Sequence, residues 1–231
     1  MFFYDLHVHA NDSIGEDSVD DIVKTAKQLD LAGIGLARYY TTDMSFDWPQ
    51  YDDIDIVKAV IIKAAGVADL ENAIRAVRDK VDLLMVHGGD YAINRRACEL
   101  GAVDILCHPE LGRRDSGMDH ITVKMARDNN VAIEINFREI LETYKRHRVY
   151  ALSYLKRNVF LCRKYGTHVI MTSAAVSRWQ MRAGRQLASL AHVLGMELVD
   201  AVAGVSTIPE TIVNTNRKKL AGNMWEGVEI K

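Results

Sequence analysis

Short runs of apolar and β-branched residues alternate with amphipathic stretches along almost the whole chain. Eight runs have the composition of strands: residues 4–9, 33–38, 56–64, 81–87, 103–108, 131–137, 168–173 and 198–204. Apolar residues at helical spacing lie between them, at 19–29, 70–77, 94–100, 119–130, 140–165, 180–194 and 209–221. Alternating strands and helices form a parallel sheet with right-handed crossovers. Eight such units in 231 residues predict a TIM-like (β/α) barrel.

The same pattern continues without an internal boundary. Only residues 39–55, after the second run, look irregular, and the chain has three prolines and no Gly/Ser-rich stretch. With 48% hydrophobic residues, the chain can bury one large core. Helix starts are marked at Ser18, where S-V-D-D fits a capping box, at Asp119 and at Pro209. We therefore expect a single TIM-like barrel domain over residues 1–231.

The sequence predicts neither export nor a membrane span. No apolar run approaches the roughly 18 residues that a transmembrane helix needs, and Asp5 and His7 interrupt the only candidate for a signal peptide. Cys98, Cys107 and Cys162 are odd in number, lack C-x-x-C spacing and lie in apolar segments. This favours buried thiols over disulfides. We expect a cytoplasmic protein without a membrane partner.

Charge is distributed unevenly, although the net charge is only −2. Residues 1–142 carry 26 acidic and 15 basic side chains, whereas residues 143–196 carry ten basic side chains and no acidic one. At the average acidic content of the chain, a segment of that length would hold about seven acidic residues. An uncompensated positive segment of this kind indicates a polyanionic partner.

Polar residues follow the predicted strands at their carboxyl ends. In a TIM barrel these ends meet at one mouth, which is where such barrels bind and react with ligands. The residues expected there are His7, His9, Arg38, His87, His108, Glu134, Asn136, Arg138, Thr172 and Ser173. Asp5, His7 and His9 alternate with apolar residues, so a regular strand would direct all three to one face. Imidazole and carboxylate groups in this place are candidate ligands for divalent ions.

The segments "HVH" at 7–9, "CHPE" at 107–110 and "IEIN" at 133–136 resemble motifs of the polymerase-and-histidinol-phosphatase (PHP) metal hydrolases. The resemblance implies a barrel related to these enzymes. It also implies a metal-dependent phosphoesterase, with His7, His9, His108 and Glu134 as metal ligands. In such enzymes two or three divalent ions activate a water and neutralise phosphate charge.

Two departures oppose this interpretation. "LARYY" (36–40) has Arg38 and Tyr39 where those hydrolases carry Thr-Asp-His, and "TSAAVSRW" (172–179) has no Asp-x-His motif. A guanidinium is always protonated and only donates hydrogen bonds, so Arg38 in the mouth would repel divalent ions. Three interpretations stay open: a multi-metal centre, a single weak metal site, and a polar remnant without metal, of which the sequence favours the last.

A larger set of segments resembles one family, the archaeal ribonuclease P protein component 3, which is related to the thirty-kilodalton subunit of the eukaryotic enzyme. The segments are "FYDLHVHA" (3–10), "GIGLARYY" (33–40), "VDLLMVHGGDYAINRRACE" (81–99), "VDILCHPELGRRDSGMDH" (103–120), "AIEINFREIL" (132–141) and "VIMTSAAVSRWQMRAGRQLASL" (169–190). The resemblance implies a PHP-like TIM barrel that is a subunit of a ribonucleoprotein endonuclease, the hydrolase that removes the 5′ leader from precursor tRNA.

The resemblance also assigns roles to the components of that enzyme. The RNA is the catalyst, so the protein carries no catalytic residue and instead binds and stabilises the ribonuclease P RNA. No cofactor is expected on the protein, and divalent metal (Mg²⁺) is expected with the RNA. The implied partners are ribonuclease P RNA, precursor tRNA in the holoenzyme and a smaller ribonuclease P protein subunit, with a heterotetramer as one arrangement.

Arginines are the expected RNA-binding residues, because guanidinium groups form charge-assisted hydrogen bonds with phosphates and stack on unpaired bases. Arg178, Arg182 and Arg185 fall at i, i+4 and i+7, which on one helix would place them on a single face. The other candidates come just after predicted strands: Arg38, Arg95, Arg96, Arg113, Arg114 and Arg138. Basic residues in "YKRHR" (144–148) and "LKRNVFLCRK" (155–164) fit either RNA binding or a solvated helix face.

Overall fold

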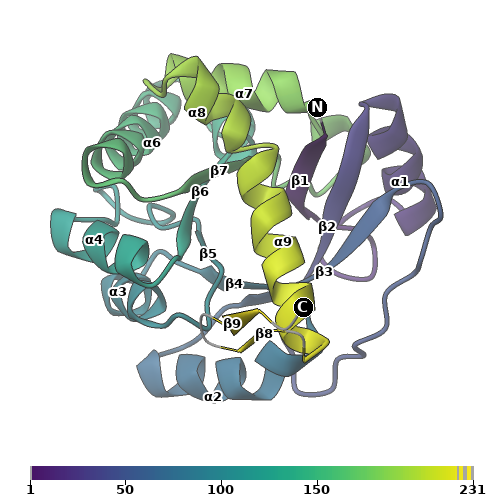
Figure 1. The fold of residues 1–231 in the computed structure, drawn as a ribbon. Coiled ribbons are helices and arrows are strands. Elements are labelled where there is room, and N and C mark those ends of the chain that lie inside the picture. Colours follow the sequence, from purple (N-terminus) through teal and green to yellow (C-terminus); the bar gives the residue numbers. More distant parts are fainter. Residues whose placement is uncertain (1, 223, 226–227, 230–231) are drawn as a thin grey trace.

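A computed structural model describes residues 2–222, 224–225 and 228–229, and Figure 1 shows their fold. The predicted domain also includes residues 1, 223, 226–227 and 230–231, which lie outside the described part. Seven parallel strands form one sheet in chain order: β1 (Phe3–Val8), β2 (Leu31–Tyr39), β3 (Asp55–Ile62), β4 (Leu83–His87), β5 (Ile105–Cys107), β6 (Ala132–Asn136) and β7 (Val169–Thr172). The sheet curls until β1 approaches β7, which gives the predicted TIM-like α/β barrel in nearly closed form.

Helices follow the strands as the sequence pattern predicts. They are α1 (Val19–Gln28), α2 (Val67–Val77), α3 (Tyr91–Glu99), α4 (His120–Asp128), α5 (Arg138–Glu142), α6 (Arg146–Tyr165), α7 (Gly184–Val193), α8 (Leu198–Ala203) and α9 (Thr207–Leu220). A 3₁₀ turn, Arg78–Lys80, extends α2, and a second one covers Arg178–Gln180. Two short strands, β8 (Met224–Trp225) and β9 (Val228–Glu229), pair antiparallel. Among the described residues, no helix is long and apolar enough to cross a membrane.

Helix caps form at Ser18 and Asp119 as predicted, whereas the predicted helix start at Pro209 is wrong, because α9 begins at Thr207. Ser18 caps α1 by accepting a hydrogen bond from the backbone N–H of Asp21, at 3.2 Å. Asp119 caps α4 by accepting from the backbone N–H groups of Ile121 and Thr122, at 3.0 and 2.8 Å. The long helical stretch predicted at 140–165 is divided, because residues 143–145 interrupt it between α5 and α6. The irregular connection after β2 is confirmed.

The eighth strand predicted at 198–204 is wrong, because this segment forms α8. Its place in the ring is taken by the turn that follows α8. The carbonyl of Gly204 accepts a hydrogen bond from Met171 of β7, and the carbonyl of Val205 accepts one from Tyr4 of β1, at 3.1 and 2.9 Å. These bonds and a bridge between Val8 and Ala175 join the two edge strands. We call this junction of β1, β7 and residues 204–205 the seam.

Two apolar layers hold the barrel together. Side chains that point outward from the strands pack against the surrounding helices, as Ile34, Val60 and Leu84 do. Side chains that point inward fill the barrel, among them Val57, Met85 and Ile105. Helix α9 crosses the end of the barrel at which the strands begin, and its Val213 enters the inner layer (Figure 1). The carboxyl ends of the strands form the opposite end of the barrel, which we call the mouth.

Candidate functional site

An irregularity in β1 directs two histidines into the barrel. Three residue steps along β1 match two along β2, which is a bulge. Leu6 points to the interior before the bulge, and His7 and His9 point there after it. The prediction that Asp5 shares their face is wrong. Asp5 lies at the seam, where its carboxylate accepts a hydrogen bond from the backbone N–H of Ser173 at 3.0 Å.

A chain of polar contacts runs across the mouth from β6 to β2. Glu134 Oε1 lies 2.7 Å from His7 Nδ1 and accepts a hydrogen bond from the Thr172 hydroxyl at 2.7 Å. His7 Nε2 lies 3.0 Å from His9 Nε2, and His9 Nδ1 lies 2.8 Å from the carbonyl oxygen of Ala37. All four polar side chains have no exposed surface. The mouth predicted from the sequence thus exists as a packed, buried network.

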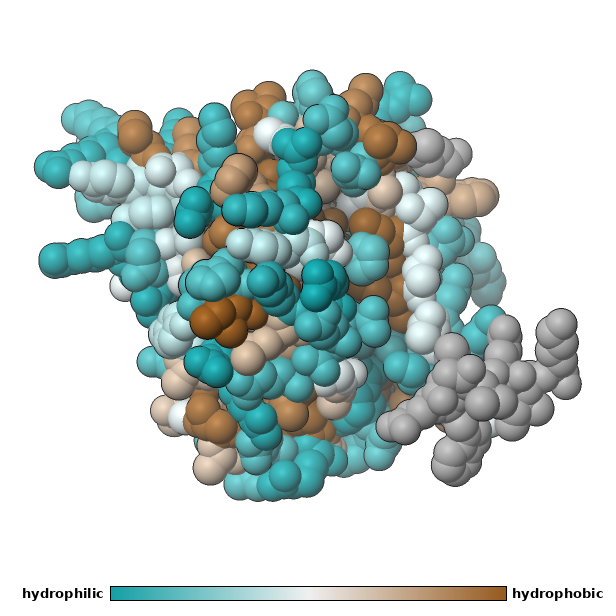
Figure 2. Space-filling model, turned by 60° about the vertical axis from the view of Figure 1, so that its left-hand side comes forward, coloured by the Kyte–Doolittle hydropathy of each residue, from teal (hydrophilic) through white to brown (hydrophobic). Residues whose placement is uncertain are grey.

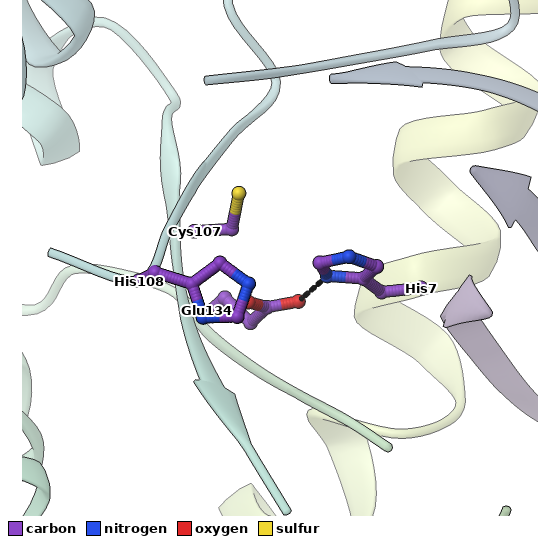
Figure 3. A group of neighbouring side chains, drawn as sticks. All are labelled: His7, Cys107, His108 and Glu134. Carbon is purple, nitrogen blue, oxygen red and sulfur yellow. Dashed lines mark hydrogen bonds and ion pairs between the residues drawn. The ribbon is translucent and has the colours of Figure 1, made fainter. Parts of the chain in front are cut away.

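His108 joins this network through an unusual backbone conformation. Successive residues of a strand point to opposite faces, but His108 follows the inward-pointing Cys107 and has a positive φ of 52°. Both side chains therefore reach the interior, beside Glu134 (Figure 3). His108 Nδ1 lies 3.0 Å from the amide nitrogen of Asn136 and 3.4 Å from a carboxylate oxygen of Glu139.

Burial strongly perturbs the titration of these groups. It lowers the pKa of His9 to about 2 and raises that of Asp5 to about 7 and that of Glu110 to about 8. Burial alone would also raise the pKa of Glu134, but the charge and hydrogen bond of His7 outweigh it and hold that pKa at about 2. Burial also lowers the pKa of His7. Burial would lower the pKa of His108 as well, but its hydrogen bond with Glu139 and the charges of Glu134 and Glu139 outweigh burial and raise that pKa.

Arg38 does not occupy the mouth, which corrects the sequence prediction. Its guanidinium packs on Trp48 outside the barrel, with its centre 4.4 Å from the ring, and donates a hydrogen bond to Asp12 at 2.8 Å. Tyr39 is the residue of this pair that points inward, where its ring stacks on His9. The predicted repulsion of divalent ions by Arg38 therefore does not operate. A different cation, the buried Arg138, lies near enough to help lower the pKa of His9.

The residues of the mouth do not fit the two or three ions of a PHP hydrolase. Arg38 lies outside the barrel, and Ser173, Ala174 and Ala175 offer no carboxylate or imidazole at the other departure from the family motif. Within the described chain, potential ligand atoms of four side chains lie within 4.8 Å of one another: His7, Cys107, His108 and Glu134. Such a set can hold one ion at most.

Six of the nine arginines predicted to bind RNA have carboxylate partners. Each forms an ion pair within 4 Å, and together they are Arg38 (Asp12), Arg95 (Glu99), Arg96 (Glu71 and Glu99), Arg113 (Asp115), Arg138 (Glu142) and Arg178 (Asp17 and Asp21). The partners of Arg95, Arg113 and Arg138 are sequence neighbours, whereas those of Arg38, Arg96 and Arg178 include carboxylates from distant turns and helices. These pairs reduce the net positive charge that the six present.

The expected row of three arginines on one helix is not formed. Arg178 lies in a 3₁₀ turn, where its guanidinium contacts Asp21 at 3.2 Å. Arg182 lies in the following connection and packs on the ring of Phe137 at 4.6 Å, whereas Arg185 is exposed in the first turn of α7. A helix break between residues 180 and 184 separates the side chains that a continuous helix would have aligned.

Six cations near the carboxyl ends of the strands have no carboxylate partner, and other unpaired cations, such as Lys24 on α1 and Arg75 on α2, lie elsewhere in the described chain. Among the described residues, no ion pair involves Arg114, Arg182 or Arg185 of the predicted set, nor Lys145, Arg146 or Arg148 at the start of α6. They lie in the segments that follow β5, β6 and β7. We call these six residues the basic rim. The sequence indicated the α6 cations through the acid-free segment, but gave no means of distinguishing them from a solvated helix face.

These features define a class of protein: a TIM-like barrel that lacks the ligand set of the multi-metal hydrolases and carries a basic rim. The chain belongs to the RNase P subunit p30 family, whose family model matches residues 2–221. This confirms the family predicted from the sequence and supports a ribonuclease P subunit over a PHP phosphoesterase.

Individual relatives agree with this assignment. The chain is 36% identical to ribonuclease P protein component 3 of Methanococcoides burtonii over 228 residues, which cover 99% of this chain and 93% of the relative. It also matches a chain in a cryo-EM structure of archaeal ribonuclease P with mature tRNA, with a TM-score of 0.79, 26% identity and coverage of 97% and 96%. The histidinol phosphate phosphatase of Lactococcus lactis shares the fold alone, with a TM-score of 0.53, 9% identity and 93% coverage of both chains.

Proposed function

We propose that this chain binds ribonuclease P RNA through the basic rim and thereby supports removal of the 5′ leader from precursor tRNA. The observation that carries the proposal is the acid-free segment, which the fold places partly at the mouth, with cations that no carboxylate neutralises. RNA phosphates bind such cations by charge-assisted hydrogen bonds and by release of counterions. The six paired arginines of the predicted set remain secondary candidates.

Aromatic side chains accompany these cations. Tyr144 and Tyr150 are exposed near the start of α6, with Lys145 and Arg146 over their rings at 5.0 and 5.4 Å. Trp179, in the segment after β7, is 77% exposed. Rings of this kind stack on unpaired bases. This arrangement favours single-stranded or looped parts of the RNA over regular duplex.

The side of the molecule that carries α3, α4 and α6 is mostly hydrophilic, which suits contact with water or with a polar partner such as RNA. Figure 2 shows that hydrophilic side chains predominate on this face and that apolar ones form small separate patches. The cations of the second half of α6 continue along this side, and Lys156 forms no ion pair with any described residue. RNA could therefore extend from the rim along α6.

We further propose the remaining components of the enzyme. Hydrolysis would rest on the RNA and its Mg²⁺ ions, because the mouth of this barrel is packed and its polar side chains are buried. A smaller protein subunit would share the particle, and the exposed Val193, Leu198 and Val199 of α7 and α8 offer it an apolar surface. A cytoplasmic location fits the three cysteines, which are free and buried.

Charge removal on the rim tests the RNA-binding proposal. We expect Arg114→Gln, Arg146→Gln and Arg185→Gln each to weaken binding of the full chain to ribonuclease P RNA. Each lost phosphate contact should reduce the slope of log affinity against log salt by about 0.7–0.9. Filter binding at several salt concentrations measures both quantities, and reconstituted cleavage of precursor tRNA gives the functional consequence.

Arg75→Gln is the matched control. Arg75 is also an exposed arginine that forms no ion pair within the described chain, but it lies in the last turn of α2, outside the basic rim and the predicted RNA-binding set. We expect its removal to leave the salt slope nearly unchanged. An equal effect of the control and the rim variants, or an unchanged slope in all of them, contradicts the proposal.

A further inference from the structure

The buried cluster at the mouth contains two polar atoms that form no hydrogen bond within the described chain. Glu134 Oε2 and His108 Nε2 are both buried and have no hydrogen-bond partner. Buried polar atoms are almost always paired, because leaving one unpaired costs the desolvation of that atom. Two such atoms in one cluster therefore point to a bound partner between them.

The donor atoms lie close enough for one ion. Figure 3 shows His7 and His108 on either side of Glu134, with Cys107 adjacent, and the four ligand atoms lie within 4.8 Å of one another. Metal–nitrogen and metal–oxygen bonds of about 2.0–2.2 Å place neighbouring ligand atoms roughly 3.3 Å apart in a tetrahedron. Small side-chain shifts would close the set. The Cys107 thiol would give up its hydrogen bond to the Val86 carbonyl oxygen, which is 3.2 Å long.

We propose that this cluster binds one transition-metal ion of the zinc class, with His7, Cys107, His108 and Glu134 as its ligands. Nitrogen, oxygen and sulfur donors in a closed set of four are typical of Zn²⁺ in a structural site. The four side chains come from β1, β5 and β6 and have no exposed surface. The ion would therefore fasten three strands together and would have no open position for a substrate.

Residues behind the ligands fit this assignment. His9 contacts the far nitrogen of His7, Thr172 donates to Glu134, and Glu139 lies 3.4 Å from His108 Nδ1. Ligands of bound metals are commonly oriented by such partners. His9 is thus a positioning residue in this proposal, whereas the PHP resemblance implies that it is a ligand. The proposal does not depend on RNA binding.

Metal binding by the full chain tests the proposal directly. The protein is stripped with a chelator and titrated with Zn²⁺ against a chromophoric competitor, while the thermal midpoint is followed. We expect one equivalent to bind and the midpoint to rise as free Zn²⁺ increases. Glu134→Gln and His108→Asn should each lower the affinity at least about tenfold. His87→Gln is the control, because His87 is buried beside His108 but lies outside the ligand set.

Co²⁺ gives a second measurement that does not require any variant to fold. A thiolate-to-cobalt charge-transfer band in the wild-type chain, absent in Cys107→Ser, supports the four-ligand set. The proposal is overturned if the stripped wild-type chain binds no Zn²⁺, or if Glu134→Gln and His87→Gln bind it equally. A wild-type cobalt complex without the thiolate band overturns the assignment of Cys107.

Discussion

Single backbone conformations decide which side chains reach the interior of this barrel. A bulge in β1 turns His7 inward, and a positive φ of 52° at His108 places it beside Cys107. Neither feature can be inferred from the sequence alternation, which assigned Asp5 to the wrong face and overlooked Cys107. The residue types of the mouth were predictable because polar groups followed apolar strands. Their geometry was not, because it depends on local exceptions to the strand pattern.

Capping residues, unlike the geometry of the mouth, could be predicted from local sequence, which identified Asp119 as the start of α4. Its carboxylate accepts hydrogen bonds from two backbone N–H groups and from the Tyr91 hydroxyl. Burial would raise its pKa, but these hydrogen bonds outweigh burial and hold the pKa below its usual value. A carboxyl group with a lowered pKa stabilises the fold above its unfolded pKa, and this contribution is lost as the pH falls through the folded value.

We therefore expect Asp119→Ala to lower the free energy of unfolding at pH 7 by about 1 kcal/mol. Asp119→Asn keeps the cap but removes the charge, so its smaller deficit should disappear when the pH falls below the folded pKa of Asp119. Urea unfolding of the three chains at neutral and acidic pH measures both effects. A deficit of Asp119→Asn that persists unchanged in acid would show that the charge contributes nothing.

At the scale of elements, α8 and the turn after it replace the missing eighth strand. Sequence pattern predicted a strand at 198–204 because Leu198, Val199 and Val202 are apolar. In the structure Leu198 and Val199 are largely exposed on a short helix, so their apolar character does not report a buried strand. The pattern could not distinguish a surface that is available to a partner from one that is packed in the core. The adjacent turn closes the ring with two backbone hydrogen bonds.

Gly204 is essential to that closure, because a Cβ atom there would lie 2.8 Å from the Val169 carbonyl oxygen of β7. We expect Gly204→Ala to lower the free energy of unfolding by about 1–3 kcal/mol, through a forced displacement of the turn. Gly101→Ala is the control, since a Cβ atom at Gly101 meets only an ordinary contact at 3.7 Å. Equal stabilities of the two variants in urea unfolding would argue against a tightly packed turn.

At the scale of the whole molecule, the sequence predicted the barrel, seven of its strands, and the family. The periodicity carried the information on the barrel and its strands, because β1 to β7 are buried on both faces and the helices on one. The family rested on the resemblance of six sequence segments. The RNA-binding surface was only partly predictable. Uncompensated charge could be counted along the chain, but six of the nine chosen arginines find carboxylates that are distant in sequence or lie beside them after folding. Ion pairing is a property of the assembled fold.

The seam gives the closed ring one weak place. The ladder between β2 and β3 has seven paired positions, whereas residues 204–205 connect β1 and β7 through isolated hydrogen bonds. Native-state hydrogen exchange should therefore find the amides of Tyr4 and Met171 exchanging through a lower-energy opening than the amides of the β2–β3 ladder. Equal protection at both places would show that the ring opens only by global unfolding.

Such an opening has a consequence for how the protein would come apart under load or heat. The barrel would open along the seam into a curved sheet, in which β1 and β7 separate while the strands between them stay hydrogen-bonded. Because β1 carries His7 and β6 carries Glu134, an ion bound to both side chains would cross-link the two sides of the seam and oppose its opening.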